Sequence, residues 1–153
     1  MNKKILVVHP TGNQNSRAVA RGLANSGTLH TFITALNIKS DNFRWLPSKI
    51  YSELKRRDFM EINGEVKSGA LFLESLRLIA AKLKIKSLIT HESGLACVDN
   101  IYLSTDKYAA QYLEKHKDEI DAVYCYEDGA LETFKTAKKL NIKCIYELPI
   151  GYW

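Results

Sequence analysis

The sequence predicts an α/β fold, a Rossmann-like three-layer sandwich in which helices cover both faces of a mainly parallel sheet. The continuous aliphatic run near the start of the chain is typical of a strand buried on both faces. Strand-like and helix-like segments also alternate at both ends of the chain, as parallel sheets with right-handed crossovers require. A composition of 46% hydrophobic and 25% charged residues over 153 residues excludes a disordered chain. We therefore expect residues 1–153 to form one domain.

The first third of the chain predicts a strand, a helix and a second strand. The strand covers residues 3–8 and leads into a loop with a single glycine, Gly12. The helix covers residues 16–24, with Asn13, Asn15 or Ser16 as alternative caps, and Gly27 ends it. Residues 29–36 are β-branched and aromatic, which predicts the second strand.

The middle of the chain, residues 37–86, is less regular. Pro47 interrupts it, and Asn63-Gly64 predicts a turn before a long helix that starts near residue 68. This helix carries apolar residues along one side and lysines towards its end at residue 86. It could lie on an anionic membrane surface, or it could pack on the sheet with its lysines in water. A second helical pattern covers residues 99–117.

The last third returns to the strand and helix rhythm. Residues 122–126 and 142–146 predict strands, and residues 131–140 predict a helix with Leu131, Phe134, Ala137 and Leu140 inward. The sequence ends on two large aromatic residues soon after a strand, so we expect a further domain to follow in the complete protein.

Charge and cysteine content point to a reducing compartment and to no particular polymer partner. The net charge of +5 is spread along the chain, so it does not predict a nucleic-acid surface. Three cysteines without a C-x-x-C pair argue against a disulfide scaffold or a zinc knuckle. We see neither a secretory signal nor a membrane span, and we expect a cytoplasmic location.

The loop after the first strand is the first candidate site, because parallel sheets bind ligands beyond the carboxyl ends of their strands. Gly12, Asn13 and Asn15 stand before a helix whose amino end favours an anion. One glycine matches neither dinucleotide nor P-loop spacing. Either the loop approaches a sugar or phosphate, or it is an ordinary turn with Asn and Ser caps.

The second candidate is the acidic pair Glu127 and Asp128, which follows Tyr126 at a strand end. Ionised carboxylates there accept protons or sugar hydroxyls, or else one of them caps the next helix. Glu147 follows the last strand, and His91 lies in a loop beside Glu92, where it could act as a base. Since there is no H-x-x-x-H or H-E-x-x-H spacing, we expect no metal site.

The stretch from Asp121 to Phe134, continuing through residues 137–139 to residues 144–153, resembles the N-terminal domain of family 4 glycosyltransferases of the GT-B fold. The opening run from Ile5 to Asn13 agrees with that family only in pattern. Many family members carry a histidine where this strand ends in Tyr126. The departure leaves Glu127 or Asp128 as the candidate catalytic groups.

This resemblance implies the acceptor-side half of an enzyme that moves a sugar from a nucleotide-sugar to a saccharide or lipid-linked acceptor. The candidate substrate-binding residues are Gly12, Asn13, Asn15, Tyr126 and His91. The resemblance implies a nucleotide-sugar co-substrate held by a second domain, no metal, no nucleic acid, and peripheral contact with the inner face of a membrane. Two alternatives stay open: a free-standing flavodoxin-like binding or regulatory module, and a non-catalytic partner subunit.

Overall fold

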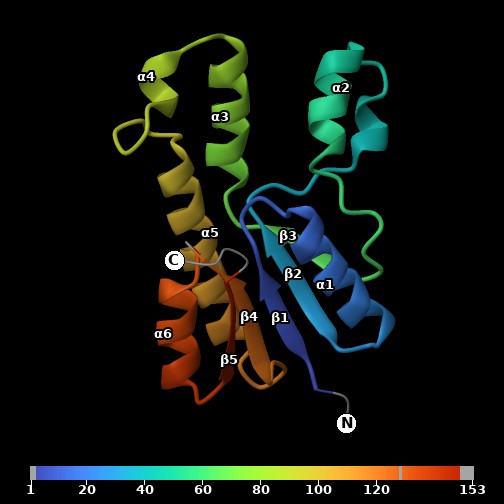
Figure 1. Ribbon diagram of the computed structural model, residues 1–153, viewed down its shortest axis with the longest axis vertical. Helices are drawn as coiled ribbons and strands as arrows, with labels where there is room; N and C mark the ends of the chain where they lie inside the picture. The colour runs from blue at the N-terminus through green and yellow to red at the C-terminus, as the bar shows by residue number, and fades with distance from the viewer. Residues whose placement is uncertain (1–2, 128, 149–153) are drawn as a thin grey trace.

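A five-stranded sheet with all its strands parallel forms the centre of the molecule (Figure 1). The computed structural model describes residues 3–127 and 129–148. The strand order is β3-β2-β1-β4-β5, which matches the first five strands of the Rossmann order 3-2-1-4-5-6. The strands are β1 (Ile5–Val8), β2 (Leu29–Thr34), β3 (Glu65–Ser68), β4 (Ala122–Tyr126) and β5 (Lys143–Glu147). The predicted fold class is therefore confirmed.

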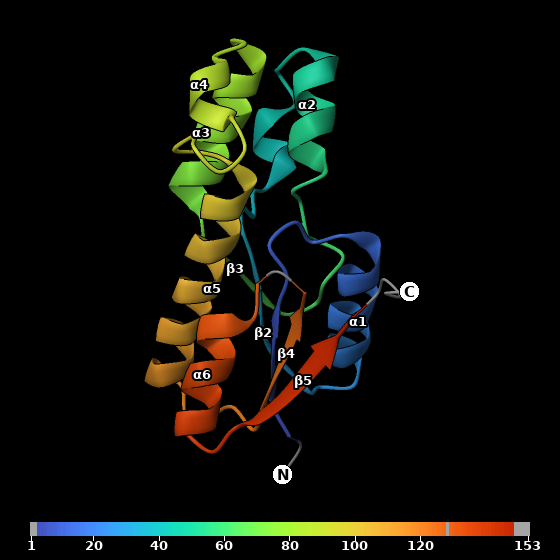
Figure 2. The ribbon, with the colours of Figure 1, turned by 60° about the vertical axis from the view of Figure 1, so that its left-hand side comes forward.

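Helices form the outer layers, with α1 on one face of the sheet and α5 and α6 on the other (Figure 2). The helices α2, α3 and α4 stand beyond the carboxyl ends of the strands (Figure 1). The helical bounds are α1 (Gln14–Asn25), η1 (a 3-10 turn, Ser40–Phe43), α2 (Ser48–Lys55), α3 (Leu71–Lys82), α4 (Lys86–Ile89), α5 (Val98–Lys115) and α6 (Leu131–Lys139).

The central strand β1 explains why its sequence is apolar without alternation. Leu6 and Val8 pack among side chains of α5 and α6, whereas Val7 packs on the opposite face with Ala20 of α1. All three strand residues are fully buried. A strand between two helical layers has no solvent face, so every position favours an apolar residue.

Asn13 is the cap that the sequence left open among three candidates. Its side-chain oxygen accepts a hydrogen bond from the Ser16 amide at 2.9 Å, and α1 therefore starts earlier than predicted. Ser16 is buried inside the helix, while Ala18, predicted on the apolar side, is exposed. Gly27 ends this unit with a φ of 70°, a backbone conformation that glycine adopts without strain.

The middle of the chain differs most from expectation. Three elements went unpredicted: the 3-10 turn η1, α2 and the edge strand β3. The predicted long helix is two helices, because α3 ends at Lys82 and Lys84 adopts a left-handed φ of 56° before α4. The α3 helix does not pack on the sheet. Its apolar side chains Leu71, Phe72, Ile79 and Leu83 are exposed.

One smaller prediction about a helix face is also corrected. Leu131 at the start of α6 is 63% exposed, although Ala137 of the same helix is buried as predicted. Across the described ranges, no helix is both long enough and apolar enough to span a bilayer.

Candidate functional site

The loops after β1 and β4 meet beyond the carboxyl ends of the two central strands. Gly129 lies so close to Pro10 that a Cβ atom on the glycine would be 3.2 Å from the proline ring. The strand order reverses between β1 and β4, and ligands of open α/β sheets bind at that point. The structure therefore brings together the two segments that the sequence singled out.

His9, which the sequence analysis missed, organises the loop after β1. Its Nδ1 atom accepts hydrogen bonds from the backbone amides of Thr11 and Gly12, at 3.2 Å and 3.0 Å. Burial lowers the pKa of His9 to about 4, so the ring is neutral near pH 7 with its proton on Nε2. A histidine that follows a buried strand and precedes Pro-Thr-Gly was the signal that could have revealed it.

Gly12 lies inside this loop instead of on its surface. It is buried with a φ of 56°, and a Cβ atom there would lie 2.4 Å from the ring of Phe59. Because its amide already donates to His9, this group points into the loop and away from any ligand. Asn13 and Asn15 are exposed, with Asn13 used as the cap of α1.

Tyr126 lies at the end of β4, packed against His9 with ring centroids 4.7 Å apart in an edge-to-face arrangement. It is 2% exposed, and its hydroxyl finds no hydrogen-bond partner among the described residues. Burial, together with the nearby Glu147 carboxylate, raises the pKa of Tyr126. Glu147 instead accepts the hydroxyl proton of Tyr124. A buried hydroxyl without a partner marks a place where a ligand or water can bind.

Of the acidic pair, Glu127 is half-buried in the turn after β4, and Asp128 lies outside the described residues. The alternative in which Glu127 caps the next helix is not seen, because Asp106 takes that role. The amino end of α6 is capped from another helix, where Asp106 of α5 accepts from the amides of Glu132 and Thr133 at 2.7 Å and 2.9 Å. Glu127 is thus placed at the sheet edge without a capping function.

His91 lies in the loop between α4 and α5, away from the loops after β1 and β4 (Figures 1 and 2). Its side chain is 75% exposed, and its ring nitrogens lie 3.9 Å from Glu92 and 3.5 Å from Asp99. The structure therefore does not group His91 with the other predicted site residues.

A cleft of about 520 Å³ opens beside the β1 loop, over the carboxyl ends of β1 and β2. Helices α2, α3 and α5 form its walls, and the β1 loop contributes Pro10 and Thr11 to its floor. Five charged side chains line it: Glu53, Arg56, Arg57, Glu74 and Arg77. Sequence reasoning missed this cleft because its charged residues come from segments that local spacing does not connect.

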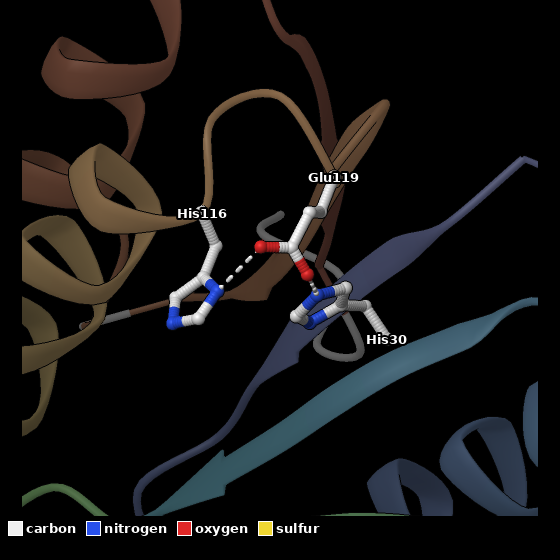
Figure 3. Close-up of side chains that lie close together, drawn as sticks. All are labelled: His30, His116 and Glu119. Atoms are coloured by element: carbon white, nitrogen blue, oxygen red, sulfur yellow. Dashed lines mark hydrogen bonds and ion pairs between the residues drawn. The ribbon is translucent and has the colours of Figure 1, made fainter.

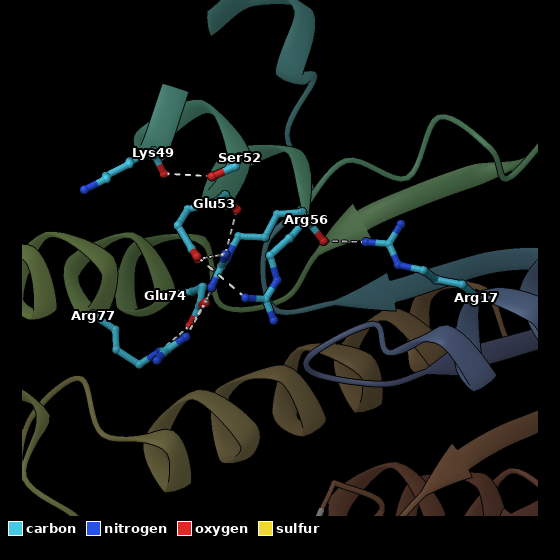
Figure 4. Close-up of polar contacts among 8 residues, drawn as sticks. Arg17, Lys49, Ser52, Glu53, Arg56, Glu74 and Arg77 are labelled. Atoms are coloured by element: carbon cyan, nitrogen blue, oxygen red, sulfur yellow. Dashed lines mark hydrogen bonds and ion pairs between the residues drawn. The ribbon is translucent and has the colours of Figure 1, made fainter. Parts of the chain in front are cut away.

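Two arginines in the cleft are fixed by one buried carboxylate (Figure 4). Arg57 Nη2 and Arg77 Nε lie 2.8 Å from Glu74 oxygens. Burial alone would raise the pKa of Glu74, but the hydrogen bonds and charges of Arg77 and Arg57 outweigh burial and lower it. Glu74 therefore stays ionised and holds both guanidinium groups in place.

Arg56 is different, because its guanidinium is 75% exposed and only 3.6 Å from Glu53. Its backbone oxygen is held by Arg17 of α1 (Figure 4). Arg17 also donates to the carbonyl oxygens of Gly12 and Asp58. Arg17 stacks on Phe59 at 3.8 Å as well. One side chain thus ties the β1 loop to the segment that carries the cleft arginines.

This arrangement can bind a polar ligand with an anionic group. Three arginines against two carboxylates leave the cleft with a net positive charge, and planar guanidinium groups recognise phosphate or carboxylate through paired hydrogen bonds. The neutral His9 and the carboxylate Glu127 lie at the neighbouring strand ends, where a ligand hydroxyl could be oriented.

Fold and site together define an α/β protein with a Rossmann-like sandwich and a polar cleft at the carboxyl edge of its sheet. No protein-family model matches the chain. A comparison with curated proteins likewise gave no match.

Proposed function

We propose that this chain is the acceptor-side domain, the N-terminal half, of a GT-B glycosyltransferase. The complete enzyme would transfer a sugar from a nucleotide-sugar to a saccharide or lipid-linked acceptor, without a metal in the reaction. The observation that carries the proposal is the arginine-lined cleft at the carboxyl edge of the sheet, next to the strand ends that present His9 and Glu127.

In this proposal the acceptor occupies the cleft, and the exposed Arg56 binds its anionic group. Arg57 and Arg77 are held by Glu74 and give the cleft wall a fixed shape. Fixed donors position a substrate with little loss of conformational entropy, which favours a reactive geometry. The phosphate of a lipid-linked saccharide is an anionic group of this kind.

Glu127 or Asp128 would orient or deprotonate the acceptor hydroxyl. A carboxylate at a strand end beside the β1 loop is suited to general base catalysis once a hydroxyl lies within hydrogen-bond reach. The exposed side chains of Asn13 and Asn15, at the amino end of α1, would contact the nucleotide-sugar that the second domain holds. Gly12 would act by shaping the loop, because its amide is engaged by His9.

The proposed location is the cytoplasm, with peripheral contact to the inner face of the membrane. The exposed apolar side of α3 and the lysines at its end support this contact. Apolar side chains flanked by lysines favour the interface of an anionic bilayer.

The decisive variant is Glu127→Gln combined with Asp128→Asn in the protein encoded by the complete gene. We expect transfer of radiolabelled sugar to acceptor to fall by about 100-fold or more, because a general base contributes about 10²–10⁴ in rate. Glu92→Gln serves as the matched control, since this carboxylate is 83% exposed on the α4–α5 loop. Normal turnover in a correctly folded double variant would refute the catalytic assignment.

A binding or regulatory module is the second candidate, and one observation favours it: Glu74 fixes Arg57 and Arg77 in the cleft through contacts within this domain. The two candidates differ in what the isolated chain does. A glycosyltransferase half should show no transfer alone, whereas a module should bind an anionic ligand and show no transfer in any longer form.

A further inference from the structure

Two histidines and a glutamate converge at the edge of the sheet opposite to the cleft (Figure 3). His30 is the second residue of β2, His116 follows the last residue of α5, and Glu119 lies in the connection from α5 to β4. We propose that these three side chains bind a zinc ion. This inference is independent of the proposed function, because the site shares no residue with the cleft.

The distances between the three side chains suit one metal ion. His30 Nε2 lies 3.3 Å from Glu119 Oε2, and His116 Nδ1 lies 3.1 Å from Glu119 Oε1. Ligand atoms on a tetrahedral zinc with bonds of about 2.0–2.1 Å lie about 3.3 Å apart. All the ligand atoms of this site fall within 4.8 Å of one another, so small side-chain rotations bring the two imidazoles to one ion.

A second layer of hydrogen bonds orients the ring of His30. Its Nδ1 atom is 3.0 Å from Thr31 Oγ1, and Thr31 donates its own proton to the Glu65 carboxylate at 2.8 Å. In the tautomer with its proton on Nδ1, His30 donates to Thr31 and keeps a lone pair on Nε2. The lone pair of Nε2 then points at Glu119.

A metal ion bound at Nε2 would lie beside the Glu119 carboxylate, whose Oε2 atom is 3.3 Å from this nitrogen. Metal-binding histidines have this same second layer, in which the other ring nitrogen donates to a fixed acceptor and so sets the tautomer. The hydrogen bonds around His30 therefore prepare Nε2 to act as a metal ligand.

His116 is also held in position before any ion arrives. Its ring stacks on Tyr112 with centroids 4.2 Å apart, and the His30 ring lies 5.6 Å away. The side chain of His30 is 12% exposed and that of His116 is 33% exposed, while Glu119 is 62% exposed. The imidazoles form a fixed inner side, and the open outer side leaves room for water ligands.

Imidazole nitrogens with one carboxylate are ligands that zinc accepts readily, in the same donor set as many zinc sites with an open position. Here the ion would tie the start of β2 to the end of α5 and to the connection before β4. Such a site adds stability to the sheet edge and takes no part in the cleft.

The loop around His91 provides a contrast inside the same chain. His91 lies near Glu92 and Asp99, but its ring is 75% exposed and its distances to these carboxylates are 3.9 Å and 3.5 Å. No second layer orients it among the contacts of the described residues. An exposed histidine near acidic groups thus serves as a control for adventitious metal binding.

The test is titration calorimetry of the whole chain with zinc chloride after removal of metals by a chelator. Cys144→Ser is the background, because this partly exposed thiol could itself bind zinc. We expect one zinc per chain. In cobalt-loaded protein we expect the intense visible absorption of a tetrahedral ion without a thiolate charge-transfer band.

Glu119→Gln and His116→Gln should each weaken zinc binding by at least about tenfold, whereas His91→Gln should leave it unchanged. Glu119 is exposed, so its variant is expected to fold normally, which circular dichroism verifies. Zinc should also raise Tm in the background protein and not in Glu119→Gln. Absence of stoichiometric binding, or equal weakening by His91→Gln, would overturn the proposal.

Discussion

At Gly12, both the backbone conformation and the packing require glycine. Its φ of 56° is strained for other residues, and its hydrogen atoms face the Phe59 ring. We expect Gly12→Ala to lower the free energy of unfolding by about 2–3 kcal/mol, because it adds backbone strain to overpacking. Urea denaturation measures the change.

Gly22→Ala is the matched control for this prediction. Gly22 lies in α1, and an added Cβ atom there would have no neighbour within 4 Å. This variant should raise the free energy of unfolding by about 0.5–1 kcal/mol, since alanine favours a helix interior. If both variants destabilise equally, the special role of Gly12 is wrong.

His9 makes stability depend on pH. Its pKa is about 4 in the folded chain and 6.5 in its ordinary environment, so between these values only the unfolded chain takes up the proton. Stability is therefore complete above pH 6.5 and falls as the pH drops towards 4. The total loss is about 3 kcal/mol, at about 1.4 kcal/mol per pKa unit.

The variant His9→Asn keeps an acceptor near the position of Nδ1 and cannot titrate. Between pH 7 and pH 5 its free energy of unfolding should decline by about 2 kcal/mol less than that of the natural chain. Denaturation at both pH values tests this. Parallel declines would show that His9 does not carry the effect, while carboxylates such as Glu74 contribute equally to both proteins.

At the scale of elements, α3 presents an apolar side that no described part of the chain covers. Phe72 is 72% exposed and Ile79 is 56% exposed, and Lys82, Lys84 and Lys86 follow. We expect the protein to sediment with vesicles that contain anionic phosphatidylglycerol. Phe72→Ser combined with Ile79→Ser should weaken this binding by about tenfold or more, because two apolar side chains no longer enter the bilayer.

Leu131→Ser provides the comparison for the vesicle experiment. Leu131 is 63% exposed on α6, far from α3, so its loss should leave binding unchanged (Figure 1). Equal binding by the α3 variant and the natural chain would contradict peripheral contact through this helix.

At the scale of the whole molecule, the sequence predicts the elements that are buried on both sides. The run from Ile5 to Val8 and the strand from Ala122 to Tyr126 are apolar because helices cover both faces. The edge strand β3 escaped prediction because it reads Glu-Val-Lys-Ser, with a single apolar residue. Edge strands are often charged, which prevents pairing with other chains and removes the pattern that identifies a strand.

The candidate site was predictable in its position and not in its charges. The rule that ligands bind beyond the carboxyl ends of parallel strands located the loops with Gly12 and Glu127. The arginines of the cleft depend on how α2 and α3 fold beyond the sheet, and no local spacing connects Arg56 with Arg77. His30 and Glu119 likewise meet only through tertiary structure, so their pairing could not be predicted from either segment alone.

The position of β1 in the sheet has a consequence for synthesis of the chain. Ile5 pairs with Ala122, so β1 waits for a neighbouring strand that is synthesised much later. At about 5–20 residues per second, that wait is on the order of ten seconds. Leu6, Val8 and Ile33 remain uncovered during this time, because α5 and α6 complete their side of the core. The nascent chain therefore exposes an apolar, aggregation-prone surface at the ribosome. A chaperone that binds this surface until β4 emerges would protect the chain from aggregation.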